Sequence, residues 1–298
     1  MAVRADEVRG IRLASTGRVA RRQAVSRASR YVLLAATLTG VAMLVYLGYE
    51  TVDRGWSRLS WDFLTSYPSR FAERAGLRSS LIGWVWVLAL TVVFAIPIAI
   101  GTAIWIEEFA PRNKLLSLVK LNLANLAGVP SIIYGILGLA VFVRFLDLGP
   151  SILAGSLTLA LMILPMTVIA SQEAIRQVPP SIRQGALALG ATRWQMVWHH
   201  VLPGAMPGIM TGTILAVSRA AGETAALIMI GAFTFIAYDN TSPFEDFTTV
   251  PVQIYNWTIR PQEAFRQNAA AAIIVLMVVI FAMNLAAAII RERFRQQQ

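Results

Sequence analysis

The sequence predicts an all-α membrane protein with six transmembrane helices, and three observations carry this prediction. Of the 298 residues, 56% are apolar and only 14% are charged, whereas soluble domains are about 25% charged. The mean hydropathy is +0.60. The apolar residues also gather in six runs, and each is long enough for the helix of about 20 residues that crosses a bilayer.

The six runs define the expected spans and the orientation of the chain. They cover residues 31–49, 81–106, 127–145, 151–170, 208–237 and 269–290. An even number of spans places both termini on the same side of the membrane. Seventeen of the 26 basic residues lie on the side of the termini, and eight lie at or near the opposite side. Because basic residues concentrate in cytoplasmic segments, both termini are expected in the cytoplasm.

Residues 1–30 are expected to form a basic cytoplasmic tail, followed by one six-span domain over residues 31–292. The tail has eight arginines and no acidic residue after Glu7. Such a segment also fits a mitochondrial transit peptide, and the run 31–49 fits a signal peptide. That run has no small-x-small cleavage site behind it, which favours an uncleaved first span. The tail is expected to contact anionic membrane lipid.

Several chemical functions are excluded by residues that the chain lacks. It has no cysteine, which removes disulfides, iron–sulfur clusters and thiol nucleophiles. It also has no phosphate-binding loop and no H-E-x-x-H motif. Its only histidines, His199 and His200, point about 100° apart on a helix. We therefore expect no catalytic residue and no metal site.

Proline and small residues modify the spans. Pro97, Pro130 and Pro165 interrupt three of them, which fits either ordinary kinked packing or a wet cavity. The fifth span carries small residues at every fourth position: Gly204, Gly208, Gly212, Ala216, Ala220 and Thr224. Such a stripe lets a neighbouring backbone approach closely. It predicts a packed face without identifying the partner.

The loop at 171–207 between the fourth and fifth spans is expected to contain two short helices. The prolines at 179–180 end the fourth span. Residues 181–184 have the pattern of a capping box, which opens a helix that ends at Gly190. A second box at 192–195 opens another helix that runs to about Val201. Apolar residues lie on these helices, and we expect a protein surface to receive them: Ala186, Leu187, Leu189, Met196 and Val197.

Two short helices around a glycine also fit a DNA-binding helix-turn-helix. A recognition helix presents several polar or basic residues to bases and phosphates. Here the second helix offers Arg193 beside Trp194, Met196 and Trp198, and spans tether the loop at both ends. No nucleic-acid partner is expected.

The loop matches most of a known pattern that reads Glu-Ala-Ala, three residues, Gly, nine residues, Ile-x-Leu-Pro. Ala186, Gly190, Leu202 and Pro203 match it with the right spacing. In these residues the chain resembles the membrane subunits of type I ABC importers. The resemblance implies the MetI-like permease fold and a coupling helix that docks in a groove of a separate ATPase subunit.

Three residues depart from the pattern. Gln184 and Gly185 stand in place of Glu and the first Ala, and His200 replaces an apolar residue. The ion pair available to the family's Glu is therefore not expected here. Gln184 either hydrogen-bonds the partner or only completes the capping box.

Four further segments resemble, in order and spacing, the permease subunits of phosphate importers. They are residues 128–142, 188–194, 218–224 and 251–257, of which 219–224 reads Arg-Ala-Ala-Gly-Glu-Thr. The resemblance implies a bacterial plasma-membrane subunit that passes inorganic phosphate inward. Its implied partners are a dimeric ATPase subunit, a second homologous permease and an extracytoplasmic phosphate-binding protein. No cofactor is expected on this subunit, because ATP and Mg²⁺ belong to the ATPase.

Arg219 and Glu223 are the charges that lie deepest in an apolar run. Each costs at least about 2.5 kcal/mol in mid-span. Four residues apart on one helix, they can form an internal ion pair. Alternatively, the Arg219 guanidinium binds phosphate oxygens, Glu223 positions it, and Thr224 adds a hydroxyl. Glu173 and Arg176, near the cytoplasmic end of the fourth span, are a weaker pair that we expect to line an exit path.

Two alternatives remain open at this stage. The first alternative stays within the same class and is a permease for another oxyanion, such as sulfate or molybdate. From a different class, the chain is a self-contained channel or secondary transporter, although such proteins usually contain internal repeats and none is evident. The outer segments 50–79 and 238–267 are expected to dock the binding protein.

Overall fold

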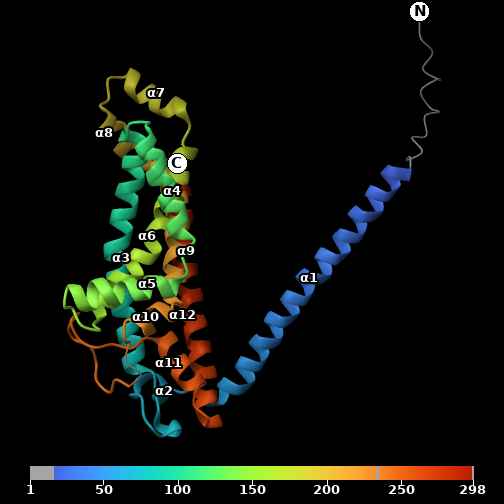
Figure 1. Cartoon of the computed structure of the whole chain (residues 1–298), viewed down its shortest axis with the longest axis vertical. Helices are drawn as coiled ribbons and strands as arrows, with labels where there is room; N and C mark the ends of the chain where they lie inside the picture. Colours follow the sequence, from blue (N-terminus) through green and yellow to red (C-terminus); the bar gives the residue numbers. More distant parts are fainter. Residues whose placement is uncertain (1–16, 233–234, 297–298) are drawn as a thin grey trace, which may run out of the picture. The chain divides into compact units, whose positions relative to one another are not determined.

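The computed structural model describes residues 17–232 and 235–296 (Figure 1). These residues form helices and connecting loops, and their only β-type pairing is one isolated bridge between Ser151 and Asp246. The predicted all-α class is therefore confirmed. The chain divides into two compact units, residues 1–51 and 52–298.

The first unit consists, within the described residues, of most of helix α1 (Gly17–Gly55). The stretch of α1 from Arg21, with its short continuation to Arg58, is long and apolar enough to cross a membrane. Residues 17–30 of the expected tail are thus helical and continuous with the first span. Residues 1–16, the rest of that tail, lie outside the described residues.

Among the described residues, all the other helices belong to the second unit. The α-helices are α2 (Trp61–Thr65), α3 (Arg78–Ile104), α4 (Lys114–Ala127), α5 (Ser131–Gly138), α6 (Ile152–Gln177), α7 (Pro180–Ala188), α8 (Arg193–Met196), α9 (Leu202–Ala221), α10 (Ala225–Met229), α11 (Val250–Thr258) and α12 (Glu263–Gln296). Three π-helical turns extend or join them: η4 (Trp105–Phe109), η5 (Leu139–Phe145) and η6 (Val197–Val201). Two 3₁₀ turns, η2 (Trp56–Arg58) and η3 (Ala72–Arg74), flank α2.

Helix α6 packs against both α3 and α9 and forms the core with them. The small-residue stripe of α9 faces α6, because a Cβ atom added at Gly208 would lie 2.6 Å from the Cβ of Ala174. Gly212 approaches Ala170 just as closely. The predicted packed face is confirmed, and its partner is α6.

The third span differs from the predicted span over 127–145. Helix α4 ends at Ala127, and the direction of the chain changes by 102° before α5 and η5. The bend contains Pro130, which has no N–H to continue the helix. The Tyr134 hydroxyl donates a 2.7 Å hydrogen bond to the carbonyl of Leu126, which belongs to the last turn of α4. Within the described residues, five helices are long and apolar enough to span a membrane, or six if α4 and α5 with η5 count as one broken span.

The fifth span also differs from the predicted range of 208–237. A continuous helix runs from Arg193 to Ala221, so the helix expected to stop near Val201 continues through Pro203. The π-helical turn η6 ends at Val201, two residues before this proline. A π turn shifts the hydrogen-bond register at the point where proline cannot donate. Beyond Ala221 the chain leaves the helix and forms the short α10.

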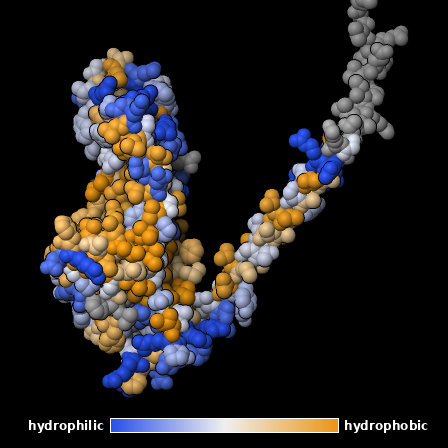
Figure 2. Space-filling view, viewed as in Figure 1, coloured by the Kyte–Doolittle hydropathy of each residue, from blue (hydrophilic) through white to orange (hydrophobic). Residues whose placement is uncertain are grey.

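The second unit has an apolar middle and polar ends (Figure 2). Helices α7 and α8 lie at one end, near the carboxyl end of α12, whereas α2 and α11 lie at the other (Figure 1). An apolar middle between two polar ends is the surface that a helical bundle embedded in a bilayer presents to lipid.

Candidate functional site

Arg219 lies in the last turn of α9, directly before a break in the helix. Helix α9 ends at Ala221, and α10 begins only at Ala225. Within the part of the chain that the structure describes, no carboxylate lies within 4.0 Å of the Arg219 guanidinium. The possible ion pair between Arg219 and Glu223 is therefore not formed, because it required one uninterrupted helix.

Glu223 has a different partner. Its carboxylate accepts a 3.1 Å hydrogen bond from the backbone N–H of Ala226, in the first turn of α10. The first N–H groups of a helix have no partner within the helix, so this carboxylate stabilises the start of α10. The Thr224 hydroxyl donates to the carbonyl of Gly222 at 3.4 Å. Both residues thus shape the break.

The surroundings of Arg219 leave its donors available. Among the described residues, the one hydrogen-bond contact of its guanidinium is from Nη1 to the sulfur of Met166, on α6, at 3.8 Å, and the residue is exposed. Tyr134, on α5, lies within electrostatic range of the guanidinium. The indole of Trp84 donates a 2.9 Å hydrogen bond to the carbonyl of Ala221 and so fixes the end of α9. A guanidinium held in this way offers N–H groups that suit the oxygens of a tetrahedral anion.

The two broken helices meet beside this arginine. A Cβ atom on Gly135, in α5, would lie 2.8 Å from the Cα of Ala226, in α10. The half-helices that follow the two breaks therefore pack directly against each other. Discontinuous helices in membrane transporters commonly form the site where the substrate binds.

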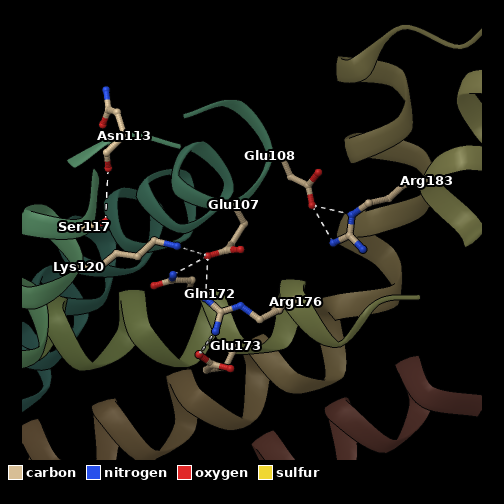
Figure 3. Close-up of polar contacts among 9 residues, drawn as sticks. All are labelled: Glu107, Glu108, Asn113, Ser117, Lys120, Gln172, Glu173, Arg176 and Arg183. Carbon is tan, nitrogen blue, oxygen red and sulfur yellow. Dashed lines mark hydrogen bonds and ion pairs between the residues drawn. The ribbon is translucent and has the colours of Figure 1, made fainter. Parts of the chain in front are cut away.

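A second polar cluster lies where η4, α4 and the carboxyl-terminal part of α6 meet, and it centres on Glu107 (Figure 3). One oxygen of its carboxylate accepts hydrogen bonds from Lys120 at 2.8 Å, from Arg176 at 3.1 Å and from Gln172. The predicted pair of Glu173 and Arg176 is formed, at 2.8 Å. Sequence reasoning did not identify Glu107, although two adjacent carboxylates at the end of an apolar run were a visible signal.

The loop before α9 contains one of the two predicted capping boxes. The Thr192 hydroxyl accepts from the N–H of Gln195 at 3.3 Å, and the Gln195 side chain accepts from the N–H of Thr192 at 2.9 Å. The first box is wrong, because α7 begins at Pro180 and its N-cap, Pro179, makes no side-chain cap. A proline at the first helical position has no N–H that needs a partner, so Ser181 lies inside the helix. Gln184 therefore does not complete a capping box.

The turn at Gly190 is as predicted. Gly190 has a φ of +84°, which is the left-handed region that glycine adopts without steric cost. The N–H of Ala191 bonds the carbonyl of Ala186 at 3.1 Å, and the N–H of Gly190 bonds that of Leu187 at 3.0 Å. These two bonds form a Schellman motif that ends α7 sharply.

The apolar residues of the loop divide into two groups. Ala186, Met196 and Val197 are buried in the chain's own core, which corrects the expectation that a partner covers all five. Leu187 and Leu189 are 44% and 92% exposed. Of the remaining residues of the pattern, Gln184, Gly185 and Pro203 are exposed and Leu202 is half-buried.

Comparison with known proteins identifies relatives across most of the chain. Residues 95–296 match the family described as "Binding-protein-dependent transport system inner membrane component". The "Probable ABC transporter permease protein YqgI" of Bacillus subtilis is 34% identical over 260 residues, which are 83% of this chain and 88% of that protein. The "Phosphate transport system permease protein PstA 1" of Mycobacterium tuberculosis is 30% identical over 258 residues, 83% of this chain and 81% of that protein.

The fold has a counterpart among solved structures. A chain of the bacterial alginate ABC transporter, crystallised with a periplasmic protein bound to an alginate pentasaccharide, superposes with a TM-score of 0.65. The match covers 89% of this chain and 94% of that chain at 18% sequence identity. The likeness therefore concerns the fold alone.

Proposed function

The chain belongs to the family of binding-protein-dependent transport system inner membrane components, and from this premise we propose that it is the permease subunit of an ATP-driven importer of inorganic phosphate. The relative from M. tuberculosis is named as a phosphate permease, and its match covers more than four-fifths of both chains. The observation that carries the proposal is Arg219, a guanidinium that has no carboxylate partner among the described residues and lies beside two broken helices.

In this proposal the substrate site lies at the breaks after α4 and α9. Phosphate that leaves water needs replacement donors, and Arg219 supplies a planar fork of N–H groups. Thr224 adds a hydroxyl, and Glu223 both orders α10 and prevents the anion from binding too tightly, since a transport site must also release its substrate. Glu173 and Arg176 lie at the inner end of α6, where they line the exit.

The proposed partners follow from the two ends of the second unit. Helix α7, with exposed Leu187 and Leu189, docks on a separate dimeric ATPase subunit, which binds ATP and Mg²⁺. This end is cytoplasmic, as are both termini. The opposite end, with α2 and α11, receives an extracytoplasmic binding protein, and a second homologous permease completes the pathway in a bacterial plasma membrane.

The proposal is tested by uptake into proteoliposomes that contain the assembled importer and internal ATP. Changing Arg219→Gln should lower phosphate uptake about ten- to hundred-fold, the range expected when a hydrogen-bonded charge is lost. Arg219→Lys should retain part of the rate, because a point charge replaces a bidentate donor. Arg144→Gln is the matched control, because Arg144 is also an exposed arginine in an apolar segment and should transport normally.

Two results would overturn the proposal. Unaltered phosphate uptake by the Arg219→Gln importer would exclude this residue from the site. Sulfate or molybdate uptake that exceeds phosphate uptake in the unaltered importer would assign the chain to another oxyanion.

A further inference from the structure

The second unit contains an ion pair that joins α7 to the inner end of α3. Arg183, in α7, donates two hydrogen bonds to one oxygen of Glu108, from Nε at 3.0 Å and from Nη2 at 2.8 Å (Figure 3). The Glu108 side chain is 7% exposed and that of Arg183 is 21% exposed. Burial protects the pair from the solvent screening that makes most surface ion pairs weak.

The same guanidinium also holds the end of α6. It donates to the carbonyl of Ile175 at 2.8 Å and to that of Val178. The last carbonyls of a helix have no partner within the helix and attract positive charge. Arg183 therefore fixes three segments to one another: α7, the carboxyl end of α6 and the π-helical turn η4.

The neighbouring carboxylate extends this connection toward the middle of the bundle. Glu107 and Glu108 are consecutive residues of η4 and point to different sides (Figure 3). Glu107 bonds Lys120 on α4, as well as Gln172 and Arg176 on α6. Helix α4 leads into the 102° bend and α5, which packs on α10 beside Arg219.

We propose that Arg183 is a positioning residue for coupling, which through Glu108 transmits movement of α7 to η4 and, through Glu107, to α4 and α6. The inference rests on the proposed function, in which α7 docks on the ATPase. Its specific content is that the link between α7 and η4 passes through one partly buried ion pair. The covalent connection of α7 to α6 through residues 178 and 179 does not by itself position α7 relative to α3.

The first experiment compares assembled importers that carry Arg183→Gln, Glu108→Gln or both changes. Each variant should still purify with its ATPase, because the exposed face of α7 is unchanged. Phosphate taken up per ATP hydrolysed should fall at least about ten-fold, the factor for about 1.4 kcal/mol, a low value for one lost charged hydrogen bond. The double variant should lose no more than Arg183→Gln alone, because both changes break the same link.

Arg112→Gln is the matched control, because Arg112 is an exposed arginine near this end of the unit and makes no ion pair among the described residues. A purely structural role for Arg183 would instead lower the yield of folded complex and leave the ratio of uptake to ATP hydrolysis unchanged. That outcome, or additive losses in the double variant, would overturn the inference.

A second measurement does not depend on the identity of the substrate. Because the chain has no cysteine, labelling of this subunit is confined to two introduced cysteines, Ser181→Cys on α7 and Ser117→Cys on α4, both at exposed positions; the subunit is labelled before assembly. The distance between the labels should shift when ATP binds to the assembled importer, and Arg183→Gln should abolish this shift. An ATP-dependent shift that persists in the variant, or none in the unaltered importer, would refute the inference even if phosphate proved to be the wrong substrate.

Discussion

The close approach of α6 and α9 gives a prediction about single methyl groups. In Gly208→Ala the added Cβ would lie 2.6 Å from the Cβ of Ala174, whereas carbon atoms in contact are about 3.5–4.0 Å apart. In Gly204→Ala, on the same stripe, the nearest atom would be a methyl of Val178 at 3.5 Å. The two variants add the same group to the same helix, but only one overlaps its neighbour.

The expected magnitudes follow from two opposing effects. Alanine is more favourable than glycine in a helix by about 1 kcal/mol, so Gly204→Ala should raise the free energy of unfolding by up to this amount. Overpacking costs about 1–3 kcal/mol, so Gly208→Ala should range from about neutral to about 2 kcal/mol destabilised. The difference between the two variants should therefore be about 1–3 kcal/mol.

The assay is thermal unfolding of the purified protein, followed by the fluorescence of its eight tryptophans. The decisive variant combines Gly208→Ala with Ala174→Gly, which moves the methyl group from α6 to α9. The overlap should disappear, and the double variant should be more stable than the sum of the single changes by about 1–3 kcal/mol. Equal stability of Gly204→Ala and Gly208→Ala, or additivity in the double variant, would show that the helices do not meet in this way.

Three further predictions concern the loops. Gly190→Val should strain the turn after α7 by about 1–3 kcal/mol, because φ is +84°; membrane insertion should be normal, while uptake and substrate-stimulated ATP hydrolysis fall together. Thr192→Ala should remove the capping box and cost about 1 kcal/mol, measurable as faster hydrogen exchange in α8. Hydrogen bonds from Arg78 hold the pKa of the Asp239 carboxyl below its ordinary value, so the stabilisation is present above about pH 4 and is lost on further acidification. Thermal unfolding of Asp239→Asn should lack this acid-dependent loss of stability. The same pH dependence of unfolding in Asp239→Asn as in the unaltered protein would contradict the prediction.

Local patterns predicted much of the fold because they act over a few residues. Gly190 needs a positive φ that other residues resist, and the box from Thr192 to Gln195 is complete within four positions. The repeat that includes Gly208 and Gly212 marks a packed face in any straight helix. The pattern does not identify the helix that packs on this face, because α6 adjoins α9 in the folded chain and not in the sequence.

The three prolines show where local reasoning fails. Pro97 and Pro165 lie inside continuous helices, α3 and α6, whereas Pro130 accompanies a bend of 102°. All three lack an N–H, so the missing donor alone does not decide the outcome. At Pro130 the Tyr134 hydroxyl satisfies a carbonyl at the end of α4, and a neighbouring helix, α10, packs against α5. Such compensation comes from residues that only the folded chain brings together.

The break after α9 has the largest consequence for function. Spacing four apart predicts an Arg219–Glu223 pair only if the helix continues, and a paired guanidinium has fewer donors left for an anion. The chain instead leaves the helix at Gly222, and the Glu223 carboxylate accepts a hydrogen bond from the N–H of Ala226. The end of the helix at Ala221 therefore separates the charges of Arg219 and Glu223. The availability of Arg219 is thus a property of where the helix ends, and it stands or falls with the capping of α10 by Glu223.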